Sequence, residues 1–209
     1  KLYSLHDHNE KLLIKKIEKV QNTSVIGMIS DAGSPLISDP GYLLVKEARK
    51  EFIDVIPIPG PSSITSVISV SGFPLDSFTF YGFLPRQIKH RKQTIKKIST
   101  DTKTSIVFES GKRIKSFLID LKEESPEIEI FIGREMTKLN ETFYRGKVYK
   151  VLDDENTQLA SGVVVLALCK ISQTFSPSDP NYSSADNSAS ISPNQFSDTT
   201  GIDGLYSFN

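Results

Sequence analysis

Two short apolar segments, each ending in a turn rich in glycine and proline, constrain the fold of this chain most strongly. Val25–Ile29 runs into Ser-Asp-Ala-Gly-Ser-Pro-Leu-Ile-Ser-Asp-Pro-Gly at Ser30–Gly41, and Val55–Ile58 runs into Pro-Gly-Pro-Ser-Ser at residues 59–63. Short apolar runs of this kind are typical of buried parallel strands. Because glycine and proline interrupt regular structure, the chain must turn after each run. We therefore expect two strand–turn units of an α/β sheet.

Three helices are expected around these two strands. Apolar residues recur at helical spacing in residues 9–20 and 42–50. Residues 64–70 are β-branched and would pass for a strand by propensity, but we interpret them as a helix that Ser62 or Ser63 caps and Gly72 ends. The order helix–strand–helix–strand–helix predicts parallel βα units.

The remainder of the chain predicts a second α/β unit and a tail. We expect strands at 78–82, 105–110, 128–132, 142–151 and 161–170, and helices at 89–99 and 112–121. In the strand at 142–151, Phe143, Val148 and Val151 are the expected inward positions. Residues 172–209 contain ten serines and no lysine or arginine, which indicates disorder. The predicted domains are residues 1–74 and 75–171, followed by the tail 172–209.

Charge and cysteine content narrow the possible partners. The formal net charge is zero, yet Arg86–Lys122 carries eleven Lys and Arg residues against three acidic ones. A basic stretch supplies sequence-independent affinity for phosphate backbones, although a Lys-rich helix is also commonly just a solvated surface. The single cysteine, Cys169, excludes an internal disulfide, and its apolar surroundings predict a buried thiol. No apolar stretch reaches the length of a membrane span.

The two turns carry groups that suit a small polar ligand. Asp31 and Asp39 are acceptors, Ser62 and Ser63 are donors at a helix N-terminus, and Gly33 allows close approach of the backbone. Such turns at the carboxyl ends of strands are where ligands bind in α/β sheets. The alternative is that both are ordinary strand–turn–helix junctions.

Six motifs in a fixed order give the chain a specific resemblance. They are Ser30–Gly41, Pro57–Ser63, Ser71-Gly-Phe-Pro74, Gly82-Phe-Leu-Pro85, Phe108-Glu-Ser110 with Arg113, and Arg134-Glu-Met-Thr-Lys138 with Arg145-Gly146. Over residues 4–151 the sequence resembles the ribosomal small subunit methyltransferase I family, within the tetrapyrrole methylase superfamily. Leu5-His-Asp-His-Asn-Glu10 is similar to the family's His-x-His-Asn-Glu stretch.

The resemblance implies a fold and a reaction. The fold would be tetrapyrrole methylase-like α/β, with an incomplete N-terminal parallel-sheet domain and a C-terminal mixed-sheet domain. The reaction would be S-adenosylmethionine-dependent 2′-O-methylation of a cytidine in 16S rRNA of the small ribosomal subunit. A cytoplasmic homodimer without a metal site or membrane contact is expected.

The resemblance also implies roles for individual residues. S-adenosylmethionine would lie between the domains, against Asp31, Ala32, Gly33, Ser34, Pro35, Ser62, Ser63 and Met136. Candidates for contacts with rRNA are Arg86, Arg91, Lys92, Arg113, Arg134 and Lys138. Glu109 and Glu135 are candidates for orienting the target hydroxyl, and an ion pair between neighbouring elements is the alternative for each.

Departures from the family pattern leave two further functions open. The sequence shows no counterpart of the family's opening strand and its Gly-rich loop, and Gly111-Lys112 replaces the usual Pro-His before Arg113. One alternative is therefore a truncated relative that binds RNA without a complete cofactor pocket. The other is a methylase of a precorrin-type tetrapyrrole, which would not need the extended basic stretch.

Overall fold

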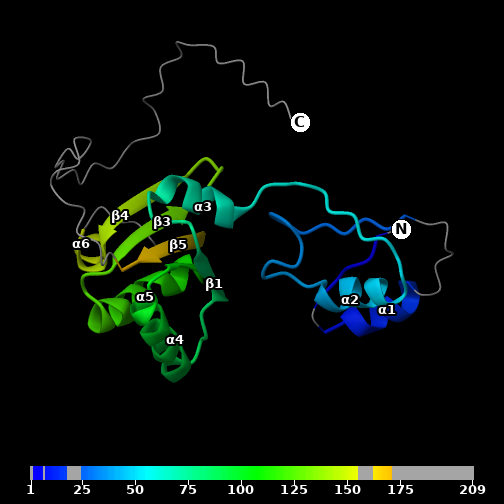
Figure 1. Ribbon diagram of the computed structural model, residues 1–209, viewed down its shortest axis with the longest axis horizontal. Helices are drawn as coiled ribbons and strands as arrows, with labels where there is room; N and C mark the ends of the chain where they lie inside the picture. Colours follow the sequence, from blue (N-terminus) through cyan, green and yellow to red (C-terminus); the bar gives the residue numbers. More distant parts are fainter. Residues whose placement is uncertain (1, 7, 18–24, 155–161, 171–209) are drawn as a thin grey trace, which may run out of the picture.

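The computed structural model describes residues 2–6, 8–17, 25–154 and 162–170 (Figure 1). Within these ranges, helices come first and a β-sheet with further helices follows. The helices are α1 (Glu10–Ile17), α2 (Tyr42–Lys50), α3 (Ser63–Ser71), α4 (Ile88–Thr100), α5 (Gly111–Glu124) and α6 (Val148–Asp153). The strands are β1 (Phe78–Phe83), β2 (Thr104–Ser110), β3 (Glu129–Arg134), β4 (Thr142–Lys147) and β5 (Val163–Cys169).

The strands form one mixed sheet in the order β1-β2-β5-β3-β4. β1 and β2 run parallel, β5 runs antiparallel to both β2 and β3, and β4 runs antiparallel to β3. The carboxyl ends of β1, β2 and β3 therefore meet at one edge of the sheet, where β4 and β5 begin. We call this edge the carboxyl edge. The mixed sheet confirms the architecture expected for the second half of the chain.

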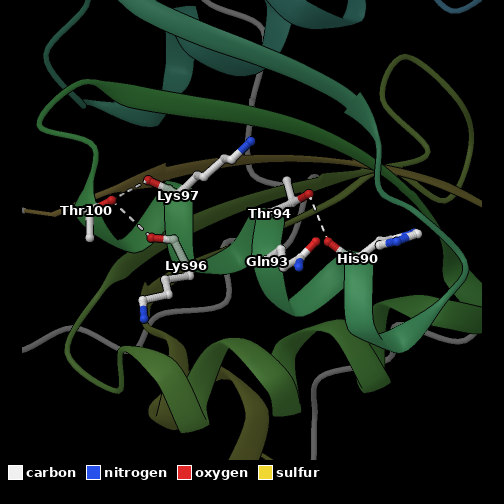
Figure 2. A pocket seen from close by; sticks show the side chains of 6 residues that line it. All are labelled: His90, Gln93, Thr94, Lys96, Lys97 and Thr100. Atoms are coloured by element: carbon white, nitrogen blue, oxygen red, sulfur yellow. Dashed lines mark hydrogen bonds between the residues drawn. The ribbon is translucent and has the colours of Figure 1, made fainter.

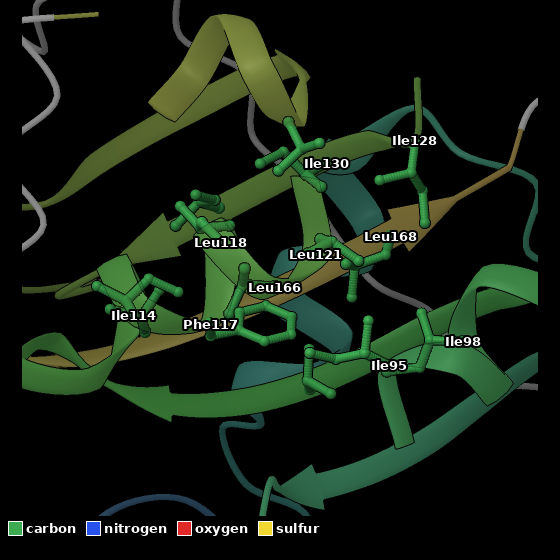
Figure 3. Close-up of a cluster of buried hydrophobic side chains, with 14 of the residues drawn as sticks. Ile95, Ile98, Ile114, Phe117, Leu118, Leu121, Ile128, Ile130, Leu166 and Leu168 are labelled. Carbon is green, nitrogen blue, oxygen red and sulfur yellow. The ribbon is translucent and has the colours of Figure 1, made fainter. Parts of the chain in front are cut away.

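Both faces of the sheet are covered, because apolar side chains on successive strand positions point to opposite sides. In β3, Ile130 and Ile132 belong to the cluster beneath α4 and α5, whereas Phe131 belongs to the cluster beneath α3. Figure 3 shows the first cluster, in which Phe117 of α5 lies against Leu166 of β5. Burying each such side chain contributes roughly 1.5–3 kcal/mol to the stability of the folded state. This packing holds the strands in place and so fixes the positions of the residues at the carboxyl edge.

α3 covers the opposite face of the sheet and packs against β3 and β5. Val67, at its centre, is fully buried. The helix ends at Gly72, whose φ of 67° is the left-handed conformation that glycine adopts readily. The structure thus confirms a helix in a segment whose β-branched residues favour a strand, because packing on the sheet outweighs local propensity.

The strands predicted at Val25–Ile29 and Val55–Ile58 are wrong. Neither segment forms a strand, and neither pairs with another strand in the described part of the chain. Val25 is 100% exposed and Ile58 is 83% exposed, so these apolar residues are not core positions. A strand needs a neighbour for its backbone hydrogen bonds. Without one, an apolar and β-branched sequence does not form a strand.

The strand predicted at residues 142–151 is only half correct. β4 ends at Lys147, and the chain continues as α6. Val148 and Val151 are buried as predicted, but their spacing of three places them on one face of a helix rather than on a strand. Phe143 is 42% exposed, so its predicted inward position is also wrong. Its ring stacks on Phe131 instead.

The remaining elements agree with expectation to within a few residues. The strands predicted from residues 78, 105, 128 and 161 correspond to β1, β2, β3 and β5, and the other predicted helices correspond to α1, α2, α4 and α5. α1 is described only to Ile17, and the tail 172–209 lies outside the described residues. The domain boundary at residue 74 stays a prediction. Among the described residues, no helix is both long and apolar enough to cross a membrane.

Candidate functional site

Several of the predicted site residues gather at the carboxyl edge of the sheet. The strand register aligns Glu109 of β2 with Val164 of β5, and Val164 with Arg134 of β3. The segment after β1 carries Arg86, and the turn after β3 carries Glu135 and Met136. The sheet topology thus brings together residues that are separated by about fifty positions in the sequence.

The two Gly/Pro-rich turns approach each other, as expected for the two walls of one site. A Cβ atom on Gly33 would stand 3.6 Å from the backbone oxygen of Pro61. The first turn also reaches the sheet, because a Cβ atom on Gly82 of β1 would stand 3.7 Å from Oγ of Ser38. The turns before α2 and before α3 and the end of β1 therefore lie side by side.

Several residues of this region hold the left-handed backbone conformation. Gly33 has a φ of 75°, and Leu36 and Ser38 have φ values of 73° and 63°. Glu135 and Thr137, in the turn after β3, have φ values of 49° and 64°. For non-glycine residues this conformation costs of order 1–3 kcal/mol and is concentrated at functional sites. The strained residues lie in the turn Ser30–Gly41 and in the turn after β3, which are parts of two of the six sequence motifs.

The start of α3 faces the turn after β3. Ile64, in the first turn of α3, and Met136 both pack against the apolar cluster on that face of the sheet. A Cβ atom on Gly133 would meet the side chains of both Met136 and Val67. Met136 is therefore placed beside α3, near the serines at its N-terminus.

The groups presented by the turns match the functional groups of S-adenosylmethionine. Ser62, at the N-cap position of α3, makes no side-chain capping hydrogen bond, and the hydroxyls of Ser62 and Ser63 can each donate or accept a hydrogen bond. The N-terminus of α3 adds backbone N–H groups that suit a carboxylate. Asp31 and Asp39 are exposed acceptors for an amine or ribose hydroxyls. The residues present therefore fit this cofactor, and a Cβ at Gly33 would narrow the space between the turns.

Glu109 is a buried ion-pair partner and does not face a substrate. Its side chain is 0% exposed, and its Oε1 lies 2.7 Å from Nε of Arg113 and 2.8 Å from the backbone N of Ser110. Nη2 of Arg113 donates to the backbone oxygen of Leu84 at 3.2 Å. The prediction that Glu109 orients a target hydroxyl is wrong, because burial removes it from reach. It orients Arg113 instead.

Glu135 lies at the carboxyl edge and is more accessible. Its side chain is 20% exposed, and its Oε2 is 3.4 Å from Nζ of Lys138. The carboxylate also lies against the backbone of Gly162, where β5 is about to begin. Gly162 accepts a hydrogen bond from the backbone N–H of Gly111 at 2.8 Å. Glu135 therefore stands where β2, β3 and β5 meet, and its role in orienting the target hydroxyl stays a prediction.

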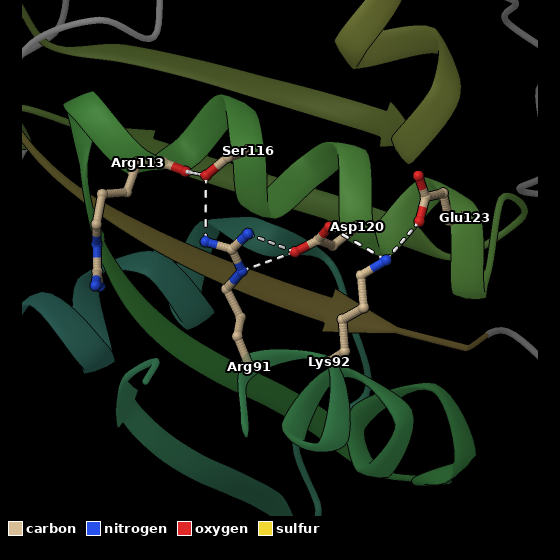
Figure 4. A network of polar contacts seen from close by, with 6 residues as sticks. All are labelled: Arg91, Lys92, Arg113, Ser116, Asp120 and Glu123. Atoms are coloured by element: carbon tan, nitrogen blue, oxygen red, sulfur yellow. Dashed lines mark hydrogen bonds and ion pairs between the residues drawn. The ribbon is translucent and has the colours of Figure 1, made fainter. Parts of the chain in front are cut away.

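Arg91 serves the packing of two helices and does not face RNA. Its guanidinium bonds Asp120 of α5 at 2.6 and 2.7 Å and donates to Oγ of Ser116 at 3.3 Å (Figure 4). Its side chain is only 9% exposed, so the prediction that it contacts phosphate is wrong. Lys92 is 51% exposed, but its amine is 2.9 Å from Glu123. An RNA contact by Lys92 would have to compete with that carboxylate.

Four predicted cations remain at or beside the carboxyl edge. Arg86 is exposed, Lys138 is 62% exposed, and Arg113 is 26% exposed. Arg134 is half-buried at the end of β3. Their approach to one edge places four cationic side chains next to the two turns, although Arg113 and Lys138 are paired there with Glu109 and Glu135.

An open hollow of about 480 Å³ lies elsewhere, along α4 (Figure 2). Its lining residues are His90, Gln93, Thr94, Lys96, Lys97 and Thr100, all from one helix. The Thr94 hydroxyl donates to the backbone oxygen of His90, so it is already engaged. The hollow includes no residue of either turn. We therefore assign the candidate site to the carboxyl edge.

Comparison with known proteins identifies the family of this chain. The family model of the tetrapyrrole (corrin/porphyrin) methylases matches residues 4–152. The chain belongs to this family. The match includes both turns and the carboxyl edge. Among solved structures, this methylase is similar to the methyltransferase CobJ with a TM-score of 0.49 and 15% identity, covering 66% of this chain and 62% of that one. A likeness at that level supports no inference about substrate.

Curated relatives place this tetrapyrrole methylase more closely. Ribosomal RNA small subunit methyltransferase I of Thermotoga maritima is 41% identical over 80% of this chain and 75% of that protein. The proteins of the same name from Escherichia coli O157:H7 and Halalkalibacterium halodurans are 36% and 44% identical over 86% and 70% of this chain. The matches span 65% and 51% of those two proteins. The chain is thus a member of the ribosomal RNA small subunit methyltransferase I family of enzymes, as the motifs predict.

Sequence reasoning missed several backbone groups of the site, and also one buried side chain outside it, Glu10, which accepts a hydrogen bond from the backbone N–H of Leu44 at the start of α2. The oxygens of Leu84 and Pro61 and the backbone of Gly162 carry no signal in their residue type, because any residue supplies a carbonyl. Glu10 is different, since it belongs to the recognised His-x-His-Asn-Glu stretch. The motif match could have marked Glu10 as important, although the sequence alone did not indicate what its side chain does.

Proposed function

We propose that this methylase transfers a methyl group from S-adenosylmethionine to the ribose 2′-hydroxyl of a cytidine in 16S rRNA of the small ribosomal subunit. The relatives carry the name of small-subunit rRNA methyltransferases, which supports the class of substrate. The observation that carries the proposal is the approach of Gly33 to the oxygen of Pro61. It supports the proposal that two motifs separated in the sequence form the two sides of one binding region.

The turns hold the methyl donor in this proposal. The backbone of Asp31–Pro35 lies on one side and Ser62, Ser63 and Met136 lie on the other. S-adenosylmethionine, when bound, supplies an activated methyl group on its sulfonium. The contribution of the protein is orientation, and a well-oriented pair of reactants can gain roughly 7–11 kcal/mol. The left-handed turn residues are consistent with a rigid, preorganised wall.

The ribose hydroxyl requires orientation and loss of a proton. Glu135 is our candidate for accepting a hydrogen bond from that hydroxyl, because its carboxylate lies at the carboxyl edge and is partly accessible. The amine of Lys138 lies 3.4 Å from Oε2 of this carboxylate and helps to orient it. Replacing Glu135 by Gln is expected to lower kcat while leaving the KM for S-adenosylmethionine unchanged.

The cations of the carboxyl edge bind the rRNA backbone in this proposal. Arg113 is held by Glu109 and by the oxygen of Leu84, so its guanidinium is oriented before RNA arrives. Arg86, Arg134 and Lys138 add charge along the same edge. Phosphate contacts of this kind position the RNA without reading its sequence. We further propose that the protein works as a homodimer in the cytoplasm, as the family resemblance implies.

The test is methyl transfer by the full chain to three acceptors. Labelled S-adenosylmethionine is supplied with small ribosomal subunits that lack the modification, with free 16S rRNA, or with a precorrin. The proposal predicts label in 2′-O-methylcytidine after digestion of the ribosomal RNA. Label in the tetrapyrrole would instead support a precorrin methylase. RNA binding without any transfer would support the non-enzymatic relative.

A further inference from the structure

Glu10 is a buried acidic residue that serves a helix other than its own. It lies in the first turn of α1, and its side chain is almost fully enclosed, with the residue 5% exposed. Its Oε1 accepts a hydrogen bond from the backbone N–H of Leu44, in the first turn of α2, at 2.9 Å. α1 and α2 pack against each other. A carboxylate from α1 therefore satisfies a backbone donor of α2.

α2 has no cap of its own among the described residues. Its N-cap position is Gly41, which has no side chain to bond the first-turn N–H groups, and its first turn contains no acidic residue. Leu44 is the third residue of the helix, the position whose N–H an N-cap side chain usually satisfies. Glu10 supplies both the missing acceptor and a negative charge at the positive end of the helix.

The segment before α1 holds Glu10 in place. The side-chain oxygen of Asn9 accepts from the backbone N–H of His6 at 2.8 Å, and its amide donates to the oxygen of Ser4 at 3.0 Å. The backbone N–H of Glu10 itself donates to the oxygen of His6 at 3.1 Å. Ser4, His6 and Asn9 thus form a locked turn whose effect is to aim Glu10 at α2.

The other end of this contact is the candidate cofactor turn. α2 begins immediately after Gly41, the last residue of the turn Ser30–Gly41. Gly41 is buried, and a Cβ atom there would meet the side chains of Met28 and Leu36. The side chains of Met28 and Leu36 therefore pack around Gly41, at the point where α2 starts. Moving the first residues of α2 would move Gly41 and, through Leu36, the turn itself.

We propose that Glu10 is a positioning residue that fixes the turn Ser30–Gly41 by capping α2 from α1. The consequence for ligand binding rests on the proposed function, because it takes Asp31–Pro35 as part of the S-adenosylmethionine site. Loss of the carboxylate frees the start of α2, so the turn samples more conformations. We expect the sheet to be unaffected, because the hydrogen bond of Glu10 goes to α2 and α1 packs against α2.

Hydrogen exchange on the full chain tests this directly. Glu10→Ala is compared with Glu10→Gln and with Lys11→Ala, an exposed neighbour on the same helix. Glu10→Ala is expected to raise exchange of residues 30–44 by roughly two- to thirtyfold, the range that loss of an N-cap produces. Glu10→Gln retains an acceptor oxygen and gives a smaller rise. Lys11→Ala leaves the turn unchanged, and exchange in β2 and β5 stays constant in all three variants.

Ligand affinity distinguishes a positioning role of Glu10 from a general loss of stability. The Kd for S-adenosylmethionine is expected to rise in Glu10→Ala by a factor similar to that of exchange, while RNA affinity stays unchanged. Equal exchange of residues 30–44 in Glu10→Ala and Lys11→Ala would overturn the inference, as would a rise spread over the whole sheet. A rise confined to the turn with an unchanged Kd would overturn its link to ligand binding.

The two proposals fail in different ways. If the unaltered chain does not bind S-adenosylmethionine, the proposed function fails, and the exchange data alone decide whether Glu10 holds the turn. If Glu10→Ala does not fold, Glu10→Gln decides by the same comparison with Lys11→Ala.

Discussion

Arg91 of α4 and Asp120 of α5 form an ion pair that is almost completely buried. Nε and Nη2 of the arginine lie 2.7 and 2.6 Å from the same carboxylate oxygen, and the side chains are 9% and 11% exposed. This pair ties together the two helices that cover one face of the sheet. It explains why a basic residue from the Lys-rich segment is unavailable to RNA.

Removing Arg91 should therefore destabilise the fold. Arg91→Ala leaves the largely buried Asp120 with only the amine of Lys92, 3.8 Å away, as a counter-charge, and we expect a loss of roughly 3 kcal/mol in the free energy of unfolding, the lower end of the range for a broken buried pair. Urea unfolding followed by circular dichroism measures it. Lys96→Ala on the exposed side of α4 is the control and should change stability by no more than about 0.5 kcal/mol. Equal losses in the two variants would contradict the buried pair.

Glu109 and Arg113 should behave as a coupled pair. Arg113→Ala leaves a fully buried carboxylate unpaired, whereas Glu109→Gln combined with Arg113→Ala removes that charge. We expect the double variant to lose less stability than the sum of the single variants, with a coupling of roughly 1–3 kcal/mol. A double-mutant cycle in urea measures this coupling, and strict additivity would show that the pair does not stabilise the carboxyl edge.

Asp101 gives the protein a pH-dependent contribution to stability. The backbone N–H of Lys103, and then the hydroxyl of Thr79, lower the pKa of this carboxyl group. In the unfolded chain an aspartate has a pKa of about 3.9. Because the native pKa is lower, the contribution is fully present above about pH 4 and is lost as the pH falls through the native pKa.

The matching variant is Asp101→Asn. It should be less stable than the unaltered chain at pH 7, and the difference should shrink as the pH falls below about 4. Thermal unfolding at several pH values checks this, with the exposed Asp76→Asn as control. A difference that is constant with pH would rule out the ionised carboxylate as its source.

Arg86 tests the RNA surface of the carboxyl edge. Arg86→Ala should weaken RNA binding similarly for different sequences and reduce the slope of log K against log salt by about 1. Lys147, at the end of β4 and hence on the opposite edge of the sheet, is bonded to Glu127. Lys147→Ala should leave the slope unchanged. The same slope change in both variants would mean that the carboxyl edge is not a specific surface for RNA.

Strong local patterns predicted much of the fold. α2 matches its predicted range of residues 42–50, because helical spacing and flanking glycine agree there. β2, β3 and β5 are found near their predicted positions, because their apolar runs are buried between helices on both faces. The segments Val25–Ile29 and Val55–Ile58 have equally apolar runs but no partner strand among the described residues. A sequence pattern states that a segment can be a strand, whereas pairing depends on the rest of the fold.

The sequence predicted where the candidate site lies better than it predicted what each of its side chains does. The motifs identified the turns and most cations of the carboxyl edge. They could not distinguish a cation that faces solvent from one that a neighbouring helix neutralises, so Arg91 was misassigned. Nor could they show that Glu109 is enclosed. Both outcomes depend on side-chain packing between α4, α5 and β2, which residue spacing does not encode.

The central claim is that the turns at Gly33 and Pro61 together bind S-adenosylmethionine, and calorimetric titration of Gly33→Val tests it most directly. A valine side chain would face the oxygen of Pro61 from a backbone with a φ of 75°. Gly27→Val is the matched control, because no described atom lies within 4 Å of where its Cβ would stand. We predict that Gly33→Val abolishes binding and that Gly27→Val binds like the unaltered chain. Unchanged affinity in Gly33→Val would remove the turns from the site.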